Sequence, residues 1–95
     1  MRLIKTYENL TINSSFIAMI QSVIVNCKSD EIIEIPDDET DYDVVEFGII
    51  ATTVYGEEFI LAVYATEEER DYARYKLENW LISGIGNYYT MTERK

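Results

Sequence analysis

The spacing of apolar and polar residues changes several times along the chain. It predicts several strands first and then a helix. Short apolar segments at Arg2–Lys5 and Glu31–Ile35 predict two brief strands. The segment Val44–Val54 predicts a longer one, with alternate residues on one face: Val45, Phe47, Ile49, Ala51 and Thr53. Gly56 suits the positive φ of a tight turn, so we expect a hairpin into a strand over Glu58–Ala65.

Two segments are harder to assign from their pattern. Glu58–Ala65 is apolar on both faces, so we expect it at the centre of a sheet and covered on both sides, or covered by a second subunit. Phe16–Cys27 has apolar residues at helical spacing, but its many β-branched residues are typical of strands. We favour the strand here, after a polar turn over Tyr7–Ser15.

The clearest prediction is a helix over Glu67–Ser83. Thr66 and Glu69 have the spacing of a capping box, and Gly84 is placed as a left-handed C-terminal cap against which Ile85 can fold back. Its apolar stripe consists of Ala73, Leu77, Trp80 and Leu81. After the helix, Tyr88–Thr90 is strand-like and is expected to add an edge strand or to dock on another chain.

Together these elements predict an α+β fold: a small antiparallel sheet of four to five strands with a C-terminal amphipathic helix packed on it. The 95 residues suit one acidic domain over 1–95. No apolar segment reaches the ~20 residues of a membrane helix, and "MRLIKTYENL" has no signal-peptide core. We therefore expect a cytoplasmic protein of the host cell with no membrane partner.

The net charge of the chain restricts its possible functions more than any sequence motif does. The chain has 18 acidic residues against 8 Lys and Arg, a formal net charge of −10. That charge repels nucleic acid and anionic membranes and attracts basic proteins. We therefore expect no direct binding of nucleic acid.

Catalytic equipment is sparse. The chain contains no histidine, a single cysteine (Cys27, in an apolar run) and no glycine-rich phosphate loop. With no histidine and one cysteine, the chain lacks the usual ligands of a zinc site. The acidic segment after Pro36 lacks the glycine that an EF-hand calcium loop requires. The sequence therefore predicts no enzyme, no catalytic residue, no cofactor and no metal.

The stretch "FILAVYATEEERDYARYKLENWL" resembles a set of small, mostly uncharacterised proteins of bacteria and their phages, which begin with a strand of the type "MRLI". This chain departs from their pattern by lacking an early Asp-Gly turn and a following Pro-Tyr-Glu. The resemblance implies an accessory gene of a phage or mobile element and transfers no catalytic residue.

The segment "IPDDETDYD" predicts a dense acidic ridge, and tyrosines near other acids suggest further contacts. The residues expected to bind a partner are Glu34, Asp37, Asp38, Glu39, Asp41, Tyr42, Asp43, Glu57, Glu58 and Tyr75. Closely spaced carboxylates imitate a phosphate backbone. The leading hypothesis is therefore an inhibitor that occupies the groove of a basic nucleic-acid-binding host protein, such as a CRISPR or restriction nuclease, in the manner of acidic anti-CRISPR proteins.

Two alternatives stay open. The first is a self-assembling domain, compatible with a homodimer, that sequesters a small ligand at a subunit interface. It is suggested by the two-faced apolar strand and the tyrosine-rich tail. The second is an accessory subunit of a host complex.

Overall fold

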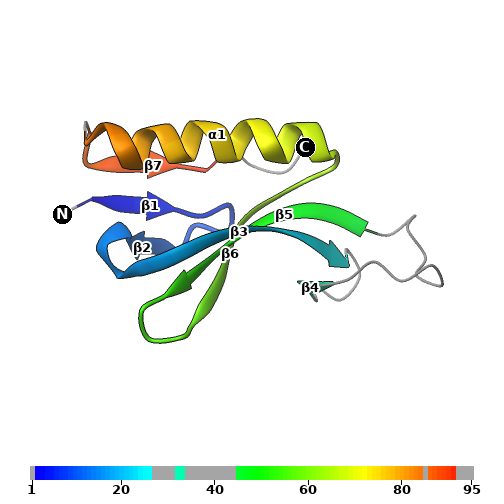
Figure 1. Ribbon diagram of the computed structural model, residues 1–95, viewed down its shortest axis with the longest axis horizontal. Helices are drawn as coiled ribbons and strands as arrows, with labels where there is room; N and C mark the ends of the chain where they lie inside the picture. The colour runs from blue at the N-terminus through cyan, green and yellow to red at the C-terminus, as the bar shows by residue number, and fades with distance from the viewer. Residues whose placement is uncertain (1, 27–31, 34–44, 85, 92–95) are drawn as a thin grey trace.

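The computed structural model describes residues 2–26, 32–33, 45–84 and 86–91, and within them the chain is α+β (Figure 1). The strand prediction for Phe16–Cys27 is confirmed over Ile17–Asn26, and the helix is confirmed over Glu67–Ser83. The elements in chain order are β1 (Leu3–Lys5), β2 (Thr11–Asn13), the 3-10 helix η1 (Ser14–Phe16), β3 (Ile17–Asn26), β4 (Ile32–Ile33), β5 (Val45–Thr53), β6 (Glu58–Tyr64), α1 (Glu67–Ser83) and β7 (Tyr88–Thr90).

The strands divide between two sheets, so the prediction of one antiparallel sheet was only partly right. One sheet has the order β2-β1-β7 and the other the order β4-β3-β5-β6. β7 pairs with β1 in parallel, with Leu3 opposite Tyr88, whereas the other pairings are antiparallel. The tyrosine-rich tail thus forms an edge strand beside the start of its own chain.

The expected polar turn over Tyr7–Ser15 was wrong in its second half, which forms β2 and η1. Asn9 has a φ of 67°, and the Thr6 N–H donates to the Leu10 carbonyl at 2.7 Å, which closes a hairpin between β1 and β2. Ile12 then lies opposite Ile4 and is buried. β2 has only three residues and one buried side chain, so it is too short to show the alternating apolar pattern of a strand in the sequence.

β6 lies at an edge of its sheet, so its predicted central position was wrong. Its outer edge accepts a hydrogen bond from the other sheet's hairpin, Tyr7 N–H to the Leu61 carbonyl at 2.9 Å. Leu61 is also the extra residue of a bulge, since Ile49 pairs with Ala62 and Ile50 pairs with Ile60. A bulge interrupts the alternation of faces, so the consecutive residues Leu61 and Ala62 both enter the core.

α1 begins and ends where the sequence predicts, although only one of the two backbone bonds of a capping box is found. The Thr66 side chain accepts the Glu69 N–H at 3.2 Å, and the Glu69 carboxylate accepts the Thr66 hydroxyl at 3.2 Å. Gly84 ends the helix in the left-handed conformation, with φ 69°. The expected contact of Ile85 lies outside the described residues.

The main core lies where α1 covers the two sheets. Ala73 and Leu77 of α1 join a cluster with members from both sheets: Ile4, Ile12, Ile49, Ala51, Leu61, Ala62, Tyr64 and Met91. Trp80 packs at its margin, with its ring centroid 5.4 Å from that of Tyr89 on β7. Burial, and secondly the neighbouring Tyr64, raise the pKa of the Tyr89 phenol above its ordinary value.

Replacing Gly84 with alanine tests the helix end directly. A Cβ at Gly84 would meet no atom within 4 Å, so the cost comes from the positive φ alone. We expect the free energy of unfolding to fall by about 1 kcal/mol, measured by urea denaturation. Gly84→Asn should cost less, because asparagine tolerates this conformation better than alanine does. Equal losses for the two variants would contradict this explanation.

Candidate partner-binding surface

Three of the chain's arginines are used inside the fold. Arg2 donates from Nε to the Gly86 carbonyl at 3.0 Å and from Nη1 to the Leu81 carbonyl at 3.1 Å, and Nη2 donates to the Trp80 carbonyl. Its guanidinium lies 3.8 Å from the centroid of the Trp80 ring. Arg2 therefore caps the C-terminal end of α1, where the helix dipole is negative.

The other two arginines join α1 to the backbone of β3. Arg70 is buried and donates to the Val23 carbonyl at 3.4 Å, and its Nη2 lies 3.0 Å from Asp71 Oδ1. Arg74 donates to Ser22 Oγ at 2.8 Å and to the Ile20 carbonyl at 3.3 Å.

The ion pairs of the described residues accordingly lie on α1. Arg70 pairs with Glu67 and Asp71, and Arg74 pairs with Glu78. No described cation lies within ion-pair distance of Glu8, Glu57, Glu58 or Glu68, all of which are exposed. Three arginines therefore make contacts that hold α1 in the fold, while these four exposed acids have no compensating cation among the described residues.

The outer face of α1 combines acids with tyrosines. Tyr72 and Tyr75 are each 63% exposed, and Glu68 and Asp71 lie on neighbouring turns. Lys76 Nζ lies 4.8 Å from the Tyr72 ring centroid. Tyr75 is therefore open to a partner, whereas Tyr64 is buried within β6.

The turn between β5 and β6 presents Tyr55, Glu57 and Glu58 to solvent. Gly56 has φ 85°, as the hairpin prediction required. Thr53 Oγ1 holds the turn by accepting the Tyr55 N–H at 3.3 Å and the Glu57 N–H at 3.2 Å. The turn is thus a fixed support for an exposed aromatic ring beside two carboxylates.

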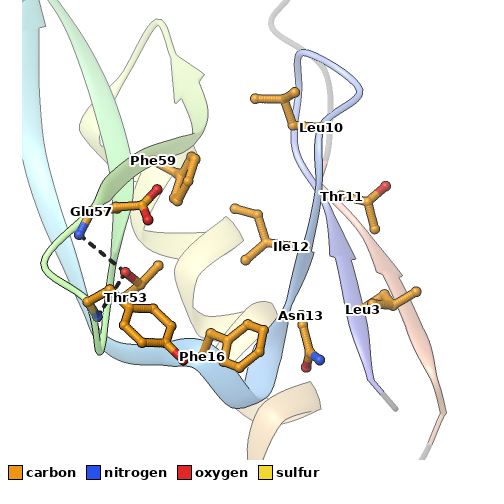
Figure 2. Close-up of a pocket in the computed structure, with 10 residues that line it drawn as sticks. Leu3, Leu10, Thr11, Ile12, Asn13, Phe16, Thr53, Glu57 and Phe59 are labelled. Atoms are coloured by element: carbon orange, nitrogen blue, oxygen red, sulfur yellow. Dashed lines mark hydrogen bonds between the residues drawn. The ribbon is translucent and has the colours of Figure 1, made fainter.

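A groove of about 520 Å³ lies between this turn and the β1–β2 hairpin (Figure 2). We call it the inter-sheet groove; its lining residues are Leu3, Leu10, Thr11, Ile12, Asn13, Phe16, Thr53, Tyr55, Glu57 and Phe59. Figure 2 shows Ile12, Phe59 and Phe16 pointing into the space between the two hairpins. The Phe16 and Tyr55 rings lie 5.9 Å apart with an interplanar angle of 57°.

The residues predicted to bind a partner fall into three groups. Glu34, Asp37, Asp38, Glu39, Asp41, Tyr42 and Asp43 lie outside the described residues, as does Cys27. Glu57 and Glu58 are exposed at the β5–β6 turn, and Tyr75 is exposed on α1. Their role as contacts stays a prediction.

Sequence reasoning missed the inter-sheet groove. Its wall includes Leu10, Ile12 and Phe16, which belong to or border the segment that was interpreted as a polar turn. Three apolar residues in such a segment were the available signal. Their pattern could not show that the turn faces the β5–β6 hairpin, which follows about forty residues later in the chain.

The two features that suggested self-assembly have partners within the chain. Leu61, Ala62, Val63 and Tyr64 of β6 are buried in this single chain. Tyr88–Thr90 pairs with β1. Neither feature therefore requires a second copy.

Within residues 2–26, 32–33, 45–84 and 86–91, no three His, Cys, Asp or Glu side chains are grouped so that they could hold a metal ion. No helix among the described residues has the length and apolar character needed to cross a membrane.

Comparison with protein-family models, with curated proteins and with solved structures found no match to the chain.

Proposed function

We propose that this chain is a non-enzymatic binding protein that presents fixed negative charge to a basic protein. In the specific form that we favour, it occupies the nucleic-acid-binding groove of a host defence protein such as a CRISPR or restriction nuclease, as acidic phage inhibitors do. Accessory genes of phages supply such inhibitors, which fits the resemblance noted in the sequence.

The observation that carries the proposal is that several exposed carboxylates have no described cation within ion-pair distance. The chain has a net charge of −10, while Arg2, Arg70 and Arg74 are used by contacts within the fold. Glu57 and Glu58 at the β5–β6 turn and Glu68 on α1 are exposed, with no described cation within ion-pair distance, and therefore act as uncompensated charge. Such a surface accelerates encounter with a basic partner and disfavours nucleic acid and other acidic proteins.

The test is capture from host lysate on the immobilised chain, with elution by a salt gradient. We expect a basic nucleic-acid-binding protein to be retained at low salt and released as the salt concentration rises, because screening weakens interactions between exposed charges. Neutralising four ridge residues, as Asp37→Asn, Asp38→Asn, Glu39→Gln and Asp41→Asn, should weaken binding of the captured protein about tenfold or more.

A matched control removes the same charge elsewhere, with the changes Glu8→Gln, Asp30→Asn, Glu68→Gln and Glu93→Gln. It should weaken binding far less than the ridge variant does, because long-range attraction then falls while local contacts remain. Retention that does not change with salt, together with equal affinities for both variants, would refute the proposed function.

A further inference from the structure

We infer that the inter-sheet groove is the docking site for a segment of the basic partner in which an apolar side chain stands next to a lysine or arginine. This inference rests on the proposed function and adds the place and chemistry of contact. The groove, at about 520 Å³, has the size of ordinary binding pockets, which measure roughly 300–1,000 Å³.

The first argument is the exposure of apolar side chains around the groove. Leu10 is 51% exposed, Phe16 is 45% exposed and Tyr55 is 73% exposed. These three belong to separate elements, yet all line one groove together with Phe59 and Ile12. Three exposed apolar side chains around one hollow are typical of a surface that a partner covers.

The second argument is the charge inside this apolar setting. Glu57 is the one charged residue among the described residues that line the groove, and its side chain lies beside the Phe59 ring in Figure 2. Thr53 fixes the Glu57 backbone, since Thr53 Oγ1 accepts the Glu57 N–H at 3.2 Å and the Thr53 N–H donates to the Glu57 carbonyl at 2.8 Å. A carboxylate next to aromatic rings favours a cation with an apolar neighbour.

The same observations identify the occupant as a protein segment. Leu10, Phe16 and Tyr55 remain exposed by 45% or more at the rim, so a small molecule in the groove would keep much of its own surface wet. A protein surface covers both the groove and the rim. A second copy of this chain is disfavoured, because each copy carries a net charge of −10.

The test uses a synthetic hexapeptide, Gly-Lys-Leu-Phe-Arg-Gly with blocked ends, titrated into the isotopically labelled full chain and followed by amide chemical shifts. We expect the largest shifts at Leu10, Ile12, Phe16, Tyr55 and Glu57. Two control peptides separate the contributions: Gly-Lys-Ala-Ala-Arg-Gly keeps the charge, and Gly-Glu-Leu-Phe-Glu-Gly keeps the apolar residues. Each should bind at least about tenfold more weakly.

Matched variants of the chain locate the contacts. Tyr55→Ala should weaken the peptide about tenfold, whereas Tyr72→Ala, at a comparably exposed tyrosine on α1, should leave its affinity unchanged. Glu57→Gln should weaken it about threefold, and Glu58→Gln, at the adjacent exposed carboxylate outside the groove lining, should have a smaller effect. Circular dichroism checks that each variant is folded.

Several outcomes would overturn the inference. These are shifts centred on α1, equal affinity for the acidic control peptide, or equal losses for Tyr55→Ala and Tyr72→Ala. Displacement of the peptide by raising the chain's own concentration would indicate a second copy as the occupant, and this would also overturn it.

The inference and the proposed function can fail separately. A salt-sensitive basic partner that binds Tyr55→Ala as tightly as the unaltered chain would refute the groove and leave the proposed function standing. A groove that binds the basic peptide, in a chain that captures no basic protein, would refute the proposed function and leave only the preference of the groove for a basic, apolar segment standing.

Discussion

Replacing Leu77 with alanine is expected to lower the free energy of unfolding by about 3 kcal/mol. Leu77 is fully buried on α1 and belongs to the cluster that joins the helix to both sheets. The change removes apolar contacts and leaves a cavity that rigid strands on two sides can fill only in part. In a domain of this size such a loss is a large fraction of the total stability, which is typically about 5–15 kcal/mol.

Urea denaturation followed by circular dichroism measures this effect, and Ile82→Ala provides the control. Ile82 is an aliphatic residue on the same helix but is 83% exposed. Its replacement should change the stability by no more than about 0.5 kcal/mol. Similar losses at both positions would mean that α1 does not pack on the sheets through the face described above.

Replacing Arg2 with methionine is expected to cost about 2 kcal/mol. The change removes a charged donor from the carbonyls of Trp80, Leu81 and Gly86 and a cation from the face of the Trp80 ring. Methionine keeps most of the apolar length, so the loss reports on the guanidinium. Arg2→Lys should recover only part of the stability, because an ammonium cannot donate along the same planar fork.

Lys5→Met is the matched control for Arg2→Met, since it removes one positive charge from β1, the strand that follows Arg2. No hydrogen bond or ion pair with another described residue is found for the Lys5 side chain, so we expect a change within about 0.5 kcal/mol. The emission of Trp80, the single tryptophan, should shift in Arg2→Met and stay constant in Lys5→Met. Equal destabilisation of both variants would attribute the effect to net charge rather than to the helix end.

The helix could be predicted to the residue because its signals are local. Thr66, Glu69 and Gly84 act on backbone groups within a few residues of themselves, so their spacing in the sequence carries the information. The β5–β6 turn was predictable for the same reason, because Gly56 supplies the positive φ where the turn requires it.

Of the candidate surface, only the exposed acidic residues and tyrosines could be predicted from the sequence. Glu57, Glu58 and Tyr75 are exposed, in accord with their polar or off-stripe positions. The inter-sheet groove was not predictable, because Leu10 and Phe16 acquire their significance from Tyr55 and Phe59, which are distant in the chain.

The sequence by itself determined the acidic character of the surface, the α+β class and the extent of α1. Charge follows from composition, and the ends of α1 follow from hydrogen bonds between residues that are close in the chain, so neither depends on how distant segments pack. Tertiary structure alone decided that the strands form two sheets, that β7 runs parallel to β1, and that Arg2 caps the far end of α1. These features join the two ends of the chain. Which distant segments meet depends on the simultaneous burial of Ile4, Leu61 and Leu77, and no local pattern encodes that choice.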